Sequence, residues 1–224
     1  LSGCIDITDT GLYELKALPI ENLNLDIYLN KRTIRLGCSK ITNYGLLQLK
    51  HMPLNILNLT HSSITDDGLA HIKHLPLKQL NLTKCTKITD DGLRHLKQMP
   101  LNILNMRSCS ITDVGMVHLK NLPINELDLS ECRNVTDEGL LHLKHLLLKR
   151  ITLYDCVDIT EDSLYHFRNN NIQICFENDI IDDNEDDEYY ENLYHYDNDD
   201  TNYTNVLCRV CGRVCVCDDD DDYY

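Results

Sequence analysis

The sequence predicts an α/β solenoid, a stack of strand–helix units with short parallel strands on the concave side and short helices on the convex side. The phrase ITDDGL occurs at 64–69 and 88–93, and near-copies begin at Ile7, Ile41, Ile111, Val135 and Ile159. From Ile41 onward, successive copies are 23, 24, 23, 24 and 24 residues apart. Alternating apolar residues precede each copy, and apolar residues three apart follow it. A fixed period of this length is typical of repeat arrays.

Each repeat begins with a predicted strand. In residues 77–100, Leu80 and Leu82 alternate with polar residues, as in a strand with one buried face. Cys85 and Ile88 continue the inward-facing positions through the turn that follows. One such unit cannot bury its own apolar stripe, so the units must stack.

The repeated phrase marks the predicted corner between strand and helix. Thr89 suits the N-cap of a helix, and Asp90 and Asp91 place negative charge where the helix dipole favours it. We interpret Gly92 as a small residue at a corner where neighbouring repeats pack closely. The phrase is therefore predicted to be structural rather than catalytic.

A short helix is expected after each corner. Leu93, Leu96 and Met99 recur every three residues and form one apolar stripe. A proline cannot continue a helix, and all five prolines lie just before the next strand. They are Pro19, Pro53, Pro76, Pro100 and Pro123.

Two domains are predicted. Residues 1–176 form an array of about seven repeats, with an insertion near 26–36 that is either a small hairpin or disordered. Residues 177–224 form an acidic tail rich in Asp, Asn and Tyr that is expected to be disordered because it has few aliphatic residues. The tail holds 17 acidic residues against Arg209 and Arg213, which accounts for the net charge of −15.

The remaining composition excludes two classes of partner. The array has 19 acidic and 19 basic residues and no clustered basic stretch, so nucleic-acid binding is not expected. No apolar run approaches the roughly 18 residues of a membrane span. A monomer that contacts no membrane is expected.

The repeat pattern L-x-x-L-x-L-x-x-C-x-x-I-T-D-x-G-L resembles the cysteine-containing subtype of leucine-rich repeats. Residues 77–93, 124–140 and 148–164 carry it closely. The resemblance implies a protein-binding array like the substrate-recognition arrays of F-box proteins in SCF-type ubiquitin ligases.

The F-box itself is not found, because residue 1 is Leu and already lies inside a repeat. SCF components are therefore expected as partners only if an F-box precedes residue 1. The alternative is a free-standing leucine-rich-repeat scaffold or effector without a ubiquitin-ligase role.

Four cysteines occupy the repeat's own cysteine position, where Ser39 and Ser62 stand in earlier copies. This exchange favours small buried side chains over disulfides or metal ligands, and buried free thiols fit a cytoplasmic or nuclear, intracellular location. The four are Cys85, Cys109, Cys132 and Cys156.

The tail carries a second cysteine group, Cys208, Cys211, Cys215 and Cys217. Four thiolates can hold zinc, which would make the chain a zinc or redox sensor, but the spacing matches no common two-knuckle pattern. We expect an unstructured tail, and no metal or cofactor. The chain also lacks a G-x-S-x-G elbow, a P-loop and a G-x-G-x-x-G motif, so no enzymatic activity is predicted.

The concave face is the predicted binding surface, because it is continuous across the repeats. An Asn-rich column lies between the strand leucines and is either a structural hydrogen-bonding ladder or a partner contact. The columns beside it vary more and include residue types common in binding hot spots. The candidate residues are Ile56, Asn58, His61, Gln79, Asn81, Lys84, Ile103, Asn105, Arg107, Glu126, Asp128, Arg150, Thr152 and Tyr154.

Overall fold

The computed structural model describes residues 8–15, 21–24, 40–176, 204–207 and 214–217. Its helices are α1 Asp9–Leu15, α2 Asn43–Leu49, α3 Asp66–Ile72, α4 Asp90–Leu93, α5 Asp113–Met116, α6 Asp137–Leu141 and α7 Glu161–Arg168, and the 3-10 turn Arg94–Leu96 continues α4. Its strands are β1 Asn22–Asn24, β2 Ile56–Asn58, β3 Gln79–Asn81, β4 Ile103–Asn105, β5 Glu126–Asp128, β6 Arg150–Thr152, β7 Gln173–Cys175, β8 Thr204–Leu207 and β9 Val214–Cys217.

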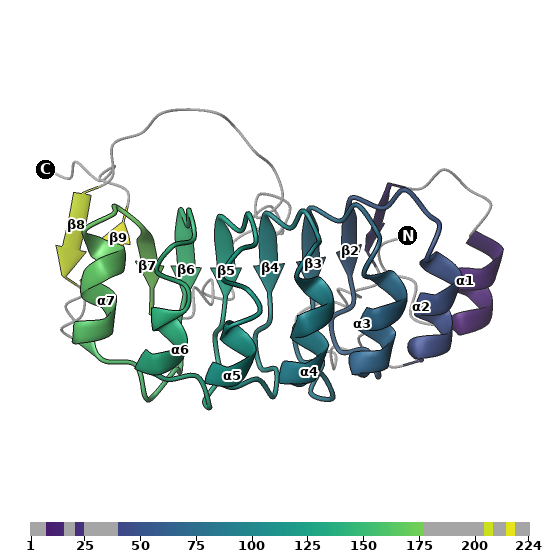
Figure 1. Ribbon diagram of the computed structural model, residues 1–224, viewed down its shortest axis with the longest axis horizontal. Coiled ribbons are helices and arrows are strands. Elements are labelled where there is room, and N and C mark those ends of the chain that lie inside the picture. Colours follow the sequence, from purple (N-terminus) through teal and green to yellow (C-terminus); the bar gives the residue numbers. More distant parts are fainter. Residues whose placement is uncertain (1–7, 16–20, 25–39, 177–203, 208–213, 218–224) are drawn as a thin grey trace, which may run out of the picture.

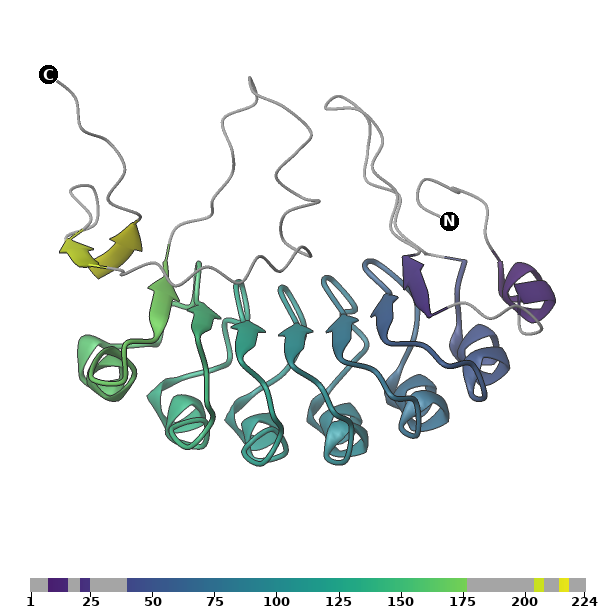
Figure 2. The ribbon, with the colours of Figure 1, turned by 90° about the horizontal axis from the view of Figure 1, so that it is seen from above.

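The strands and helices form the predicted two-layer solenoid (Figure 1). Strands β1 to β7 make one parallel sheet in chain order, and each helix packs against the next. Figure 2 shows the strands along the inner side of the arc and the helices along its outer side. The predicted fold class is therefore confirmed.

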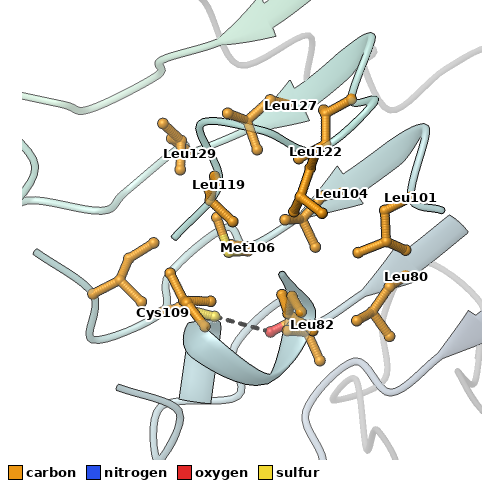
Figure 3. Close-up of a cluster of buried hydrophobic side chains, with 14 of the residues drawn as sticks. Leu80, Leu82, Leu101, Leu104, Met106, Cys109, Leu119, Leu122, Leu127 and Leu129 are labelled. Carbon is orange, nitrogen blue, oxygen red and sulfur yellow. Dashed lines mark hydrogen bonds between the residues drawn. The ribbon is translucent and has the colours of Figure 1, made fainter. Parts of the chain in front are cut away.

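The strand register aligns equivalent positions of successive repeats. Leu57 pairs with Leu80, Leu80 with Leu104, and Leu104 with Leu127. These leucines point between the sheet and the helices and are almost completely buried. Figure 3 shows how the leucines of three neighbouring repeats pack into one continuous cluster. Each buried leucine contributes about 1.5–3 kcal/mol relative to an exposed one, so stacking supplies the stability that a single unit lacks.

The helices begin as predicted but end earlier in the middle repeats. Thr89 caps α4, and its Oγ1 accepts a hydrogen bond from the Asp91 N–H at 3.3 Å. After four residues the hydrogen-bonding pattern changes to 3-10 geometry, which three-residue apolar spacing does not distinguish from an α-helix. In the sixth repeat Leu147 takes the proline position and is 88% exposed.

The repeated phrase joins neighbouring repeats through a contact that we call the corner clasp. The carboxylate of Asp90 accepts the Thr112 N–H at 2.8 Å and the Thr112 hydroxyl at 2.7 Å, across one repeat junction. The same pair of bonds recurs at the four other described junctions that carry aspartate. At the remaining one, Asn43 Oδ1 accepts the Thr65 N–H, and the Asn43 amide donates to the Thr65 hydroxyl oxygen.

The glycine of the phrase leaves room for the clasp. A Cβ added at Gly115 would lie 2.4 Å from Oδ1 of Asp90, and one at Gly92 would lie 2.3 Å from Oδ1 of Asp66. The interpretation of this glycine as a close-packing residue is therefore confirmed. In the last repeat Ser163 takes its place, and the Ser163 hydroxyl donates to the Thr160 carbonyl at 2.9 Å.

The predictions about the insertion and the tail concern segments that lie mainly outside the described residues. The insertion near 26–36 is among them, as is all of 177–224 except β8 and β9. These two strands pair antiparallel, and β9 lies beside β7.

We predict that Gly115→Ala destabilises the array by about 1–3 kcal/mol, because the new methyl group displaces the Asp90 carboxylate. This loss outweighs the gain in helix propensity of about 1 kcal/mol. Urea unfolding followed by circular dichroism measures it. Ser163→Ala is the matched control, since that position already carries a Cβ. Equal stability of Gly115→Ala and the parent chain would contradict the steric account.

We predict that Asp90→Ala lowers the free energy of unfolding by about 1–3 kcal/mol, because the Thr112 N–H and hydroxyl lose their acceptor at a half-buried site. Asp91→Ala removes a neighbouring carboxylate that makes only an exposed ion pair with Arg94. It should change stability by no more than about 0.5 kcal/mol. The same urea titration compares the two, and equal losses would argue against the clasp.

Candidate functional site

The concave face presents two strand columns in register. Ile56, Gln79, Ile103, Glu126 and Arg150 lie side by side across β2 to β6, and Asn58, Asn81, Asn105, Asp128 and Thr152 form the second column. All of these side chains are half-buried except Asn58, which is buried. The helices cover the other face of the sheet, and none of the described helices lies on this face (Figure 2).

The Asn column has a structural role in the turn that follows each strand. Asn105 Oδ1 accepts the Arg107 N–H at 3.0 Å, and Asp128 accepts the Ser130 N–H at 2.8 Å. Asn58 and Asn81 make the same bond two residues ahead. Such side-chain bonds stabilise tight turns. These side-chain oxygens bond mainly within their own turns. The column also bonds to neighbouring repeats in part, as the predicted ladder requires, because Asn105 accepts from the Thr83 hydroxyl at 2.8 Å and hydrogen-bonds to Asp128.

Each of these turns places one residue in the left-handed region. His61, Lys84, Ser108, Glu131 and Asp155 have φ angles between 54° and 60°. This conformation is uncommon for residues other than glycine and strains the backbone. The hydrogen bonds of the asparagine side chains offset this strain. We call this column, which lies in the turns after the strands, the rim of the concave face.

The rim brings together three residues from neighbouring repeats. Nη2 and Nε of Arg107 donate to Oε1 of Glu131 at 2.7 and 3.1 Å. The Ser108 hydroxyl donates to the other carboxylate oxygen of Glu131. This hydrogen bond and the bonds from Arg107 hold the pKa of Glu131 below its usual value, although partial burial opposes the shift.

Tyr154 and Arg150 complete this part of the face. The guanidinium carbon of Arg107 lies 5.8 Å from the centre of the Tyr154 ring, within cation–π range. Arg150 donates to Gln173 at 2.8 Å. Burial raises the pKa of the nearby Asp128. The structure thus places Arg107 and Tyr154 together, as one part of the predicted surface.

Glu131 and Ser108 are missing from the residues singled out by sequence. Glu131 lies 24 residues after Arg107, one repeat away, and its column is adjacent to that of Arg107. The repeat register could therefore have identified the pair.

The four repeat cysteines are buried within the core. Cys109 donates its thiol hydrogen to the Leu82 carbonyl at 3.1 Å (Figure 3), and Cys85, Cys132 and Cys156 make equivalent bonds. Burial raises the pKa of Cys85 to about 11 and those of Cys132 and Cys156 to about 12. They are free thiols, as expected.

The metal and membrane predictions can be compared only with the described residues. Among these, no group of three or more His, Cys, Asp or Glu side chains is arranged to hold a metal ion. Cys215 and Cys217 lie in β9, whereas Cys208 and Cys211 lie outside the described residues. Over the same described segments, no helix has the length and apolar character to cross a bilayer.

The central part of the array is similar to a known repeat family. A family model described as Leucine Rich repeat matches residues 50–72, 73–96, 97–119 and 120–144. No curated protein matches the chain by sequence. The crystal structure of the Rad7 and Elc1 complex in yeast is similar, with 14% identity over 73% of this chain and a TM-score of 0.45. The match spans 64% of that chain, less than two thirds of its length. A similarity at this level does not extend to a partner or an activity.

We predict that the four core thiols react slowly with iodoacetamide in the folded chain, because only the thiolate reacts and the raised pKa keeps it rare. For Cys85, a rise from 9.0 to about 11 lowers the thiolate fraction at pH 8 about 100-fold. Timed alkylation with mass spectrometry, in buffer and in urea, measures this. Equal rates in the two conditions would show that the thiols are accessible and ionised.

Proposed function

We propose that this leucine-rich-repeat chain is a non-enzymatic, intracellular recognition module that binds a protein partner on its concave face. The repeats support a protein-interaction role, since such arrays generally bind proteins. We choose the concave face because its sheet surface is half-exposed and because the strand register and the turns align its variable side chains.

The rim cluster favours binding between repeats four and six. Arg107 is held by Glu131 and lies beside Tyr154, so these side chains are partly ordered before a partner arrives. Immobilising a long side chain costs roughly 0.5–1.5 kcal/mol on binding, and prior ordering removes part of this cost. Arg and Tyr are also common hot-spot residues. A partner with acidic and apolar groups would complement Arg150, Tyr154 and Ile103.

We further propose that the module recognises substrates for an SCF-type ubiquitin ligase. The support is the resemblance of the repeat, with its buried cysteine, to the arrays of F-box proteins. The alternative is a free-standing scaffold or effector that occupies a regulatory protein. Co-purification of a cullin with the chain would favour the first, and a partner recovered without any ligase subunit would favour the second.

We predict that Arg150→Ala with Tyr154→Ala weakens partner binding at least tenfold, because two concave side chains at one rim are lost. Arg94→Ala with Tyr165→Ala is the matched control, since it removes the same residue types from exposed positions on the helices. Quantitative affinity capture from cell lysate, followed by titration of the captured protein, measures both. Equal losses in the two variants, or none in the concave variant, would reject this face.

A further inference from the structure

The connections from each helix to the next strand form one edge of the solenoid, which we call the basic edge. It consists of residues 49–55, 72–78, 96–102, 119–125 and 143–149. None of these segments contains Asp or Glu. They carry seven lysines, all of them exposed: Lys50, Lys73, Lys78, Lys97, Lys120, Lys144 and Lys149. The folded array therefore separates its charges, although its sequence is balanced overall.

These lysines are not neutralised by the array itself. Within the described residues, none of the seven forms an ion pair with a carboxylate. The arginines of the concave rim differ, because Arg107 pairs with Glu131 and Arg133 with Asp155. An acidic segment would therefore meet seven lysines without a carboxylate partner in the described part of the array at the basic edge, whereas Arg107 and Arg133 already have one.

Five of the lysines form a regular row. Lys50, Lys73 and Lys97 follow the last residues of α2, α3 and the 3-10 turn after α4. Lys120 and Lys144 hold the equivalent position in the turns after α5 and α6. Packed helices lie about 8–10 Å apart, so the four intervals of this row span about 32–40 Å. The charge of Lys73 acts on the next repeat: burial lowers the pKa of His95, Arg94 and Lys73 lower it further, and Asp66 and Asp67 oppose the shift. His118 is affected in the same way by burial and then Lys97.

The chain contains a segment of complementary charge. Residues 177–203 hold 12 acidic residues and no Lys or Arg, and seven of the acids fall within 182–191. The segment follows Phe176, directly after β7. Phe176 follows the carboxyl end of β7, on the edge opposite the basic edge, so the segment must first cross the last repeat. Fifteen extended residues span about 50 Å, which allows residues 182–191 to make this crossing and reach the nearer lysines of the row. A tether of this length gives a high effective concentration without any external partner.

We propose that the basic edge is a docking surface for the acidic segment 177–203 of the same chain. The contact is electrostatic, between aligned lysines and closely spaced carboxylates, and does not involve the concave face. It is therefore weakened by salt and by competing polyanions. The surface lies outside the proposed binding site, so its test is independent of the proposed function.

Zero-length carbodiimide cross-linking of the full chain tests the contact, because it joins only carboxylates and amines that touch. We expect links from 177–203 to Lys97, Lys120 and Lys144 to exceed links to Lys87 at least fivefold, an attraction of about 1 kcal/mol. Lys87 is the control because it is an exposed lysine on the opposite, strand-to-helix edge. The links should disappear in about 1 M salt, where the Debye length is about 3 Å.

Charge reversal tests whether the links depend on the basic edge, and isotope mixing tests whether they form within one chain. In the variant K97E/K120E/K144E, links to the unchanged Lys73 and Lys149 should also fall, whereas K87E should leave them intact. Mixing ¹⁴N- and ¹⁵N-labelled chains distinguishes links within one chain from links between two. Equal linking to Lys87, persistence of the links in high salt, or links mainly between chains would each overturn the proposal.

Discussion

At each described repeat junction, a carboxylate or amide at the start of one helix holds the threonine that begins the next. In the Asp90–Thr112 clasp, one side chain satisfies a backbone N–H and a hydroxyl together, and Gly115 leaves the space it needs. This contact fixes the offset between neighbouring helices. The offset in turn fixes the strand register, so the concave columns depend on a bond made at the far corner of the repeat.

The turn after each strand is also held by a side chain that bonds to the backbone. The side-chain oxygens of Asn105 and its equivalents accept backbone N–H groups. These hydrogen bonds hold the following turn, in which one residue is left-handed. The variable residues beside them are then presented at constant spacing. Arg107 can therefore meet Glu131 from the next repeat, and a charged rim forms across separate segments of the chain.

Interactions within one repeat could be predicted from the sequence, whereas most of those between repeats could not. The roles of Leu80 and Thr89 follow from the sequence because period and capping preference are local properties. Gly92 contacts the preceding repeat, but a small residue at the same place in nearly every copy already indicates a close approach. Asp90 was assigned to the helix dipole, and its bond to Thr112 was missed because it depends on the offset between repeats. The early end of α4 was missed because α and 3-10 turns share the same apolar spacing. The role of Asn105 required the turn geometry.

The clasp also bears on how such an array changes over generations. Each middle repeat carries both halves of the contact, an acceptor for the following unit and a Thr–Gly pair for the preceding one. A duplicated unit would therefore meet compatible neighbours on both sides without any compensating substitution. Gene segments of this kind can be copied or deleted whole, and the length of the inner surface can be adjusted separately from the residues that it displays.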